Sequence, residues 1–376
     1  MLDSFPKFNG LNVSSKFAIC GLPIRLDTYK TCSFGCQYCF ANGRKIMEFR
    51  KNLQVANVAQ IERVLENVRS GNYPKHRLLE TLVSCGITWH CGGMSDPFQP
   101  INRELCITNE VIDICNRHDV SILFSTKGDD VHGANIRPDL HSFQLSVTNV
   151  EDRHDIEPGV PPIADRVAFF KRLKSEGFRV GIRIQPFIPG ISDVRILEAF
   201  PDADHFTIEG IKIVPQNKEQ IEYVRDVLHI PISAFVNNGL FTLKEEYRRH
   251  LYKPIIDWLE KNNKSYSVSD NDMRWMGNNR CCCGDALIRK ATGFDTTAVL
   301  NGGCIEGNPV YERCKGCNCQ HLFTSNRIDF GKTVEEFFRA KANSKAHPAS
   351  KRFQVSRNEQ MELFPLEETV EFLEHA

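Results

Sequence analysis

Apolar positions along residues 23–260 switch between two spacings, which indicates strands separated by helices. Short runs rich in β-branched residues predict six strands, at residues 23–27, 86–90, 120–126, 142–148, 179–186 and 207–214. Because helical patterns separate these runs, the chain reads as repeated strand–helix units. The pattern predicts an α/β fold in which helices cover a parallel sheet, and it leaves open whether that sheet is flat or a partial barrel.

The helical segments carry apolar stripes with spacings of three and four residues. Thr108 is predicted to cap the second helix, Gly177 to end the third, and residues 244–261 to form a long closing helix. A further short helix is predicted near residues 333–342. The four stripes consist of Val55, Val58, Ile61, Val64, Leu65 and Val68; of Val111, Ile112 and Cys115; of Val167, Phe170 and Leu173; and of Ile221, Val224 and Leu228.

Composition restricts the class of protein. A chain of 376 residues with 41% hydrophobic residues fits one large domain with an appendage, or two domains. Its 47 basic and 47 acidic residues argue against a polybasic protein that binds nucleic acid by bulk attraction. No apolar run approaches the ~20 residues of a membrane span, and the first residues lack the pattern of a signal peptide. We therefore expect a cytoplasmic protein with no membrane partner.

The 15 cysteines fall into two groups, eight before residue 116 and seven between residues 281 and 319. Cytosolic thiols are kept reduced, so a disulfide framework is not expected. Two separate groups instead predict two inorganic sites.

The first group contains Cys32, Cys36 and Cys39, directly after the first predicted strand. Three thiolates at this spacing can bind three irons of a cubane and leave the fourth iron open. That iron could chelate S-adenosylmethionine (SAM), and an electron could cleave it to methionine and a 5′-deoxyadenosyl radical. A zinc knuckle is the alternative, but zinc sites favour paired two-residue spacings and a fourth ligand nearby. The residues favour a [4Fe–4S] cluster.

With an aromatic residue, Tyr38, before its third cysteine, this segment resembles the radical SAM superfamily. The resemblance implies a partial (β/α)6 TIM-type barrel, a [4Fe–4S] cluster and SAM as cofactors, and an electron donor such as flavodoxin or ferredoxin. Residues 1–262 would form this core, residues 263–330 a cysteine-rich segment, and residues 331–376 a C-terminal helix and polar tail.

Later segments resemble, in order, the subgroup around spore photoproduct lyase over about residues 20–195. The resemblance implies that a glycine pair holds the SAM amino group beside two acceptors, and that a lysine pairs with the SAM carboxylate. A serine would bind the carboxylate or ribose, and an arginine is a further candidate. These residues are Gly92, Gly93, Ser95, Asp96, Lys127, Ser146 and Arg183.

One position departs from that subgroup. Its lyase carries a hydrogen-donating cysteine where this chain has Met94, and a thioether has no S–H to donate. Thymine-dimer repair by that route is therefore not expected, unless Cys91 substitutes as the donor.

The second group comprises seven cysteines within residues 281–319, a density that implies metal-assisted folding. Adjacent side chains diverge, so we expect two of the first three cysteines to share a site with later ones. The segment resembles the auxiliary iron–sulfur extensions of radical SAM enzymes, although its spacing differs from the SPASM pattern. An auxiliary [4Fe–4S] cluster is favoured over zinc, with unligated thiols as a third reading. The candidates are Cys281, Cys282, Cys283, Cys304, Cys314, Cys317 and Cys319.

The tail segment Gln360, Leu363 and Phe364 resembles the short peptide by which bacterial DNA enzymes bind the replication sliding clamp. Two apolar side chains would fill a pocket while the glutamine fixes the register. The sequence thus predicts a radical SAM enzyme that modifies or repairs nucleic acid. A radical SAM enzyme acting on a peptide or small molecule, and a non-catalytic iron–sulfur or zinc adaptor, are the alternatives.

Overall fold

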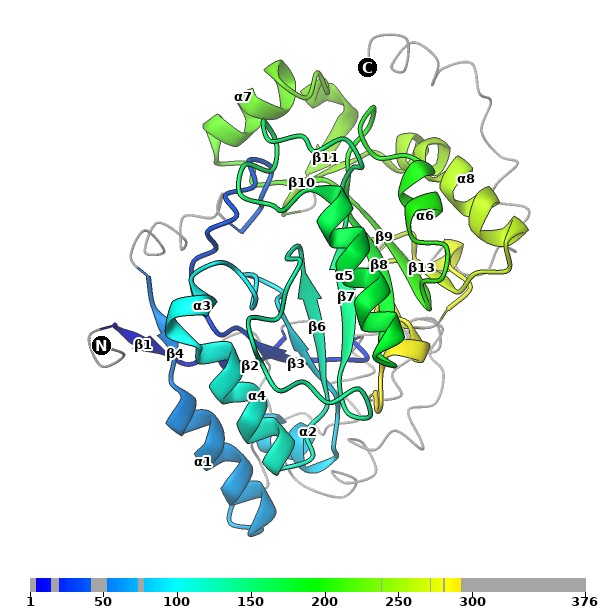
Figure 1. Ribbon diagram of the computed structural model, residues 1–376. Helices are drawn as coiled ribbons and strands as arrows, with labels where there is room; N and C mark the ends of the chain where they lie inside the picture. Colours follow the sequence, from blue (N-terminus) through cyan, green and yellow to red (C-terminus); the bar gives the residue numbers. More distant parts are fainter. Residues whose placement is uncertain are drawn as a thin grey trace, which may run out of the picture.

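The computed structural model describes residues 5–14, 20–41, 53–73, 78–237, 239–270, 272–279 and 281–291 (Figure 1). The helix predicted near residues 333–342, Cys304, Cys314, Cys317 and Cys319, and the tail segment at residues 360–364 lie outside this part of the chain.

An eight-stranded sheet forms the centre of the structure, with the strand order β13-β9-β8-β7-β6-β5-β3-β2. Strand β2 is antiparallel to β3, and every other neighbouring pair is parallel. The predicted α/β fold with a parallel sheet is therefore confirmed. The strands are β2 Leu11–Val13, β3 Ile24–Leu26, β5 Trp89–Cys91, β6 Ile122–Thr126, β7 Ser142–Ser146, β8 Arg179–Phe187, β9 His205–Gly210 and β13 Tyr266–Val268.

At the far edge of the sheet, one predicted strand is divided and one observed strand was not predicted. The run predicted at residues 207–214 is divided, because β9 ends at Gly210 and β10 (Lys212–Ile213) belongs to a separate antiparallel sheet. That sheet also contains β11 (Phe235–Asn237) and β12 (Phe241–Leu243). Strand β13 was not predicted, since it consists of only three residues within a polar stretch. It forms because β9 offers a free edge for parallel pairing.

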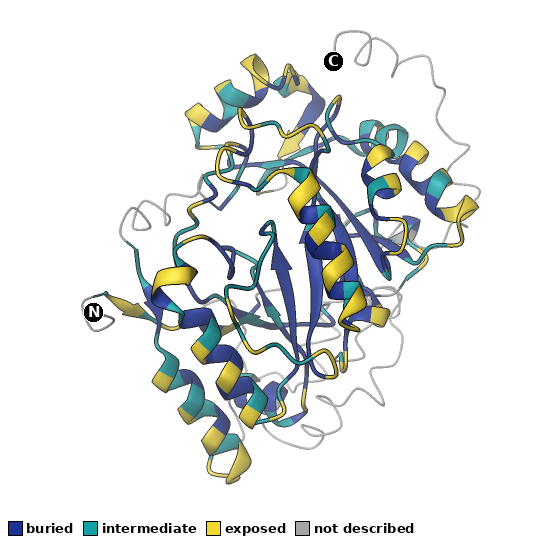
Figure 2. Cartoon of the chain, in the orientation of Figure 1, coloured by how far each residue is buried: buried dark blue, intermediate teal, exposed yellow. Residues whose placement is uncertain are grey.

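The helices lie around this sheet with their polar sides exposed (Figures 1 and 2). Two further short strands, β1 (Lys7–Phe8) and β4 (Val55–Ala56), pair with each other. The α-helices are α1 Val58–Arg69, α2 Leu78–Ser84, α3 Asn102–Leu105, α4 Ile107–Arg117, α5 Ile163–Ser175, α6 Arg195–Ala199, α7 Lys218–Asp226 and α8 Glu245–Lys261, and the 3-10 helices are Ile232–Ala234, Arg274–Met276 and Asp285–Leu287.

Helix ends differ from prediction where tertiary contacts decide them. Val55 lies in β4, and α1 starts after Asn57, whose side chain accepts a hydrogen bond from the Gln60 N–H at 3.2 Å. Thr108 lies inside α4, and its hydroxyl bonds to the Pro97 carbonyl at 2.7 Å. Leu228 lies beyond the end of α7. The predicted end of α5 is confirmed, since Gly177 follows it with a φ of +85°.

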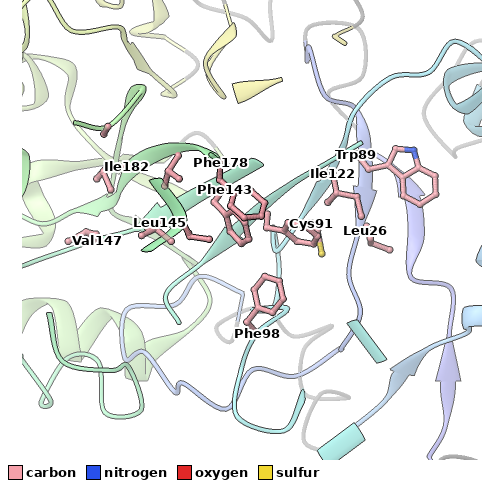
Figure 3. Packing of buried hydrophobic residues seen from close by; sticks show 14 of the residues in the cluster. Leu26, Trp89, Cys91, Phe98, Ile122, Phe143, Leu145, Val147, Phe178 and Ile182 are labelled. Atoms are coloured by element: carbon pink, nitrogen blue, oxygen red, sulfur yellow. The ribbon is translucent and has the colours of Figure 1, made fainter. Parts of the chain in front are cut away.

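Side chains of the central strands alternate between two environments. Those of Phe124 and Phe143 pack beneath the helices, in the core that Figure 3 shows. Their neighbours Ser125 and Gln144 are register partners and are buried on the other side, the inner face of the sheet. The inner face is thus polar and the helix-covered face apolar.

A second core lies at the carboxyl end of the strands, where α7 packs with the small antiparallel sheet. It contains Ile188, Ile211 and Val224, and it also buries Tyr38 from the first cysteine segment. The Gln220 amide of α7 donates to the Tyr38 carbonyl at 3.0 Å. This small unit therefore holds one end of the cysteine segment.

Helix α8 is tied to the sheet edge by the buried side chain of Arg248, which is 1% exposed. Its Nη1 donates to Asp272 Oδ1 at 2.8 Å and lies 3.4 Å from Asp270 Oδ1. Asp270 also accepts from the Tyr252 hydroxyl at 2.8 Å and from the Gly210 N–H at 3.1 Å. Burial opposes ionisation of Asp270, but the charges of Arg248 and Lys212 and the hydrogen bonds from Tyr252 and Gly210 together hold the pKa of this carboxyl below its ordinary value.

Replacing Arg248 by methionine should lower the free energy of unfolding by about 3–5 kcal/mol, because the Asp270 charge would stay buried without its partner. The contribution is present at neutral pH and is lost as the pH falls through the lowered pKa of Asp270. Urea unfolding measures it. Lys253→Met, which removes an exposed pair with Asp257 in the same helix, is the control and should cost below about 0.5 kcal/mol. Equal losses in the two variants would contradict the assignment.

Candidate functional site

The three cysteines of the first group lie in the loop that follows β3, at the carboxyl edge of the parallel sheet. Gln99, which is 1% exposed, holds this loop from the side. Its Oε1 accepts from the Ser33 N–H at 2.7 Å and its Nε2 donates to the Thr31 carbonyl at 2.8 Å. One amide side chain thus fixes both sides of Cys32. The sequence analysis did not single out Gln99, since its partners are backbone groups.

A second loop supports the cysteine segment from the opposite side. The Gln37 N–H donates to the Ile156 carbonyl at 2.9 Å, and the Gly159 N–H donates to the Phe34 carbonyl at 3.0 Å. A Cβ at Gly159 would lie 3.0 Å from Phe34 Cα, so only glycine allows this approach without displacement. The backbone of the cysteine segment is therefore fixed by two other loops.

The thiols face these neighbouring loops. Burial raises the pKa of the Cys32 thiol above its ordinary value, and the charge of Asp96 adds to the effect. Burial also raises the pKa of Cys36 to about 12, against the charge of Lys127. Such thiols ionise at neutral pH when a metal replaces their protons. The donor set fits a metal cofactor.

Gly92 provides a close approach of backbone at the end of β5. Its φ is +97°, and a Cβ there would lie 2.1 Å from the Ser125 carbonyl oxygen. Any other residue would push the two loops apart. At Gly93 the nearest atoms to such a Cβ are those of the His90 ring at 3.9 Å, which is an ordinary contact. The structure therefore requires glycine at the first position and leaves room beside the second.

Ser95 and Asp96 bond to the chain itself. The Asp96 carboxylate accepts from the Phe98 N–H at 2.9 Å, the Thr126 hydroxyl at 2.7 Å and the Lys127 N–H at 2.7 Å. The Ser95 hydroxyl donates to the Tyr29 carbonyl. Both residues join the loop after β5 to neighbouring segments, and their predicted contact with a ligand remains a prediction.

Lys127 lies in a buried polar cluster with Tyr38, Thr148 and Glu157. Its Nζ is 2.7 Å from Glu157 Oε1 and 3.1 Å from Thr148 Oγ1, and it lies 5.6 Å from the centre of the Tyr38 ring. The Tyr38 hydroxyl bonds to both Glu157 and Thr148. Burial alone would raise the pKa of Glu157, but the charges of Lys127 and Arg166 outweigh it and lower that pKa.

Ser146 and Arg183 are register partners on β7 and β8. The Ser146 hydroxyl has no hydrogen-bond partner within the described part of the chain, whereas its carbonyl accepts from Arg166. Arg183 is 8% exposed and donates from Nη2 to Glu209 Oε2 at 2.9 Å. Its buried Nη1 has no partner among the described residues. A buried guanidinium with an unused donor fits an anionic ligand on the inner face.

Three residues that were not predicted as site residues thus organise the site: Gln99, Glu157 and Glu209. Glu157 and Gln99 lie in segments that the resemblance already covers, but their roles depend on partners 30 and 66 residues away. Glu209 also bonds to Lys212. No local pattern signals such partners.

Cys91 does not lie in this site. It is 0% exposed and packs in the helix-covered core, together with Trp89 and Phe98 (Figure 3). His90 lies between Trp89 and Cys91 in β5, so its side chain is on the inner face of the sheet. There its Nε2 lies 2.8 Å from Ser125 Oγ. The prediction that Cys91 could serve as the hydrogen donor, in place of the cysteine that Met94 replaces, is therefore wrong. Alternate side chains of a strand face opposite sides of the sheet.

Within the described residues, no group of three His, Cys, Asp or Glu side chains has the spacing that binds a single metal ion. A zinc ion needs thiolates about 2.3 Å from one centre, whereas a cubane distributes them over separate irons. In the same part of the chain, no helix is long and apolar enough to cross a membrane.

No protein-family model matches the chain, and no curated protein sequence is similar to it. Solved structures are similar. One is a spore photoproduct lyase variant with a dinucleoside spore photoproduct, at 15% identity and a TM-score of 0.52, covering 69% of this chain and 78% of that chain. Another lyase variant, with bound SAM and the same dinucleoside, has 15% identity and a TM-score of 0.51, covering 66% and 76%. The chain therefore shares its fold with spore photoproduct lyase.

Proposed function

We propose that the protein is a radical SAM enzyme. The observation that carries the proposal is the meeting of three chain segments at one edge of the sheet. These are the cysteine loop after β3, the Gly92 turn after β5 and Lys127 after β6. Parallel α/β sheets place their chemistry at this edge.

In this proposal Cys32, Cys36 and Cys39 hold a [4Fe–4S] cluster whose fourth iron is open to SAM. When bound together, the cluster and SAM would supply a carbon radical that abstracts hydrogen from an unactivated position. The chain contributes positioning. Gln99 fixes the cysteine loop, and Gly92 lets the turn after β5 lie against the backbone of Ser125 in β6.

Lys127 would bind the SAM carboxylate by giving up its longest hydrogen bond, the 3.5 Å contact with the Ser146 carbonyl, while it keeps its bonds to Glu157 and Thr148. Glu157 and Tyr38 keep the lysine at that place. Ser146 and Arg183 offer further donors on the adjacent strands. An electron donor such as flavodoxin or ferredoxin would supply the reducing equivalent.

For the substrate we propose nucleic acid. Support comes from the similarity to a lyase that binds a dinucleoside, and from the tail sequence that resembles a clamp-binding peptide. A second metal centre at the C-terminal cysteines would bind substrate or carry an electron. Action on a peptide or small molecule is the alternative within the same chemistry, and an adaptor without SAM cleavage is the alternative outside it.

Reductive cleavage of SAM tests the enzyme proposal. Anaerobically reconstituted protein, reduced with dithionite, should convert SAM to 5′-deoxyadenosine. Cys36→Ala should abolish the product, because two thiolates do not hold a site-differentiated cubane. Cys106→Ala, at a part-exposed cysteine before α4, should leave the yield unchanged. Iron-loaded protein that yields no product, with or without nucleic acid, would favour the adaptor.

The role of Lys127 in binding SAM can be separated from its role in folding. Lys127→Met alone should cost about 3–5 kcal/mol of stability, because Glu157 stays buried and charged. Adding Glu157→Gln removes that charge and should recover most of the lost stability. If Lys127 binds the SAM carboxylate, the double variant should still bind SAM about 10- to 150-fold more weakly.

Equilibrium binding of SAM to the unreduced, reconstituted protein measures this effect, and thermal unfolding monitors the fold. Glu157→Gln alone shows how much the placement of the lysine contributes, and it should weaken SAM binding less than the double variant does. Wild-type affinity in the folded double variant would remove Lys127 from the ligand contacts.

Recovery of the chain on immobilised sliding clamp tests the proposed partner. The wild type should bind and Phe364→Ala should not, because the aromatic side chain would fill the apolar pocket. Phe353→Ala, in the same tail, is the control for a general loss of apolar contacts. Equal recovery of wild type and Phe364→Ala would refute clamp binding.

A further inference from the structure

The segment that contains Cys281, Cys282 and Cys283 is docked on the inner face of the sheet. The Cys282 carbonyl accepts from the Thr207 hydroxyl at 2.9 Å and from the Ser267 hydroxyl at 3.1 Å. The Cys283 carbonyl accepts from the Gln144 amide at 3.3 Å. These bonds come from β7, β9 and β13, so three strands fix the backbone of the three cysteines.

Apolar packing holds the same segment. The side chain of Leu287 fills the space above Gly181, where a Cβ would lie 2.5 Å from Leu287 Cδ1. Leu22, Leu123, Leu287 and Ile288 form a small buried core with Cys281 and Cys283. The cysteines are therefore part of the folded interior.

The N-terminal segment brings a fourth cysteine to this place. A Cβ at Gly21 would lie 2.9 Å from Cys281 Sγ, so the backbone beside Cys20 touches the thiol group. Leu22, on the other side, packs in the core that contains Cys281. The segment of Cys20 thus meets the segment of Cys281, Cys282 and Cys283, although 260 residues lie between Cys20 and Cys281 in the sequence.

We propose that Cys20 is a ligand of the same iron–sulfur cluster as the Cys281–Cys283 segment, at the inner face of the partial barrel. The inference deepens the proposed second metal centre and rests on it. A cluster suits this segment because the side chains of adjacent cysteines diverge, and a cubane distributes its thiolates over separate irons. The first cysteine group would then supply both sites, through Cys20 and through Cys32, Cys36 and Cys39.

Thiol protection in the wild type tests the proposal without any mutation. In the reconstituted full-length protein Cys20 should resist alkylation by iodoacetamide, and it should react once a chelator and an oxidant have removed the iron. Cys115, a buried cysteine of the helix-covered core, should stay unlabelled in both states and so report that the fold persists. Labelling of Cys20 in the iron-loaded protein would overturn the proposal.

Iron counting gives an independent answer. A variant with alanine at Cys32, Cys36 and Cys39 should retain the second centre, with about four irons and four sulfides per chain. Adding Cys20→Ala should remove most of that iron, whereas adding Cys106→Ala should not. Zinc in place of iron, a Cys20–Cys281 disulfide, or iron content unaffected by Cys20→Ala would each overturn the proposal. Because the first cluster is absent here, the result does not depend on SAM cleavage.

Discussion

Alternation of side chains along the parallel strands β6 to β9 is the constraint on which the rest of the structure depends. Strand pairing places Phe124 beside Phe143 and Ser125 beside Gln144, so one face of the sheet is apolar and the other polar. Helices cover the first face, as in Figure 1. The polar face is also buried, and buried polar groups need partners. Carbonyl groups of Cys282 and Cys283 satisfy Thr207 and Gln144, which explains why a distant segment lies inside the barrel.

The carboxyl edge obeys a different requirement, since its loops carry reactive groups and still need a fixed geometry. Backbone contacts supply it. Gln99 bonds on both sides of Cys32, and the turn around Gly159 bonds to the backbone of the same loop. The buried pair of Lys127 and Glu157 adds a fixed charge arrangement next to Cys36. A site held in this way changes little when a ligand binds, which lowers the cost of binding.

The two cysteine groups of the sequence do not correspond to two places in the fold. Cys20 belongs to the first group in sequence, but its neighbour Gly21 contacts Cys281, while Cys91 and Cys115 are buried in the helix-covered core. Spacing along the chain identifies cysteines that share a loop, as with Cys32, Cys36 and Cys39. It gives no information on thiols that meet through the pairing of strands.

The sequence by itself determined the α/β class, four of the strands to within about two residues of their ends, the long helix α8, and the loop that carries three cysteines, because periodicity and spacing are local properties. Only the tertiary structure decided that β13 joins the sheet at the free edge of β9, that Thr108 bonds to Pro97 instead of capping a helix, and that Cys91 faces away from the site. It also decided that Glu157 pairs with Lys127 and that the segment of Cys20 approaches Cys281. These features depend on contacts between residues that are distant in sequence, and such contacts follow from strand order, register and burial, which no local pattern encodes.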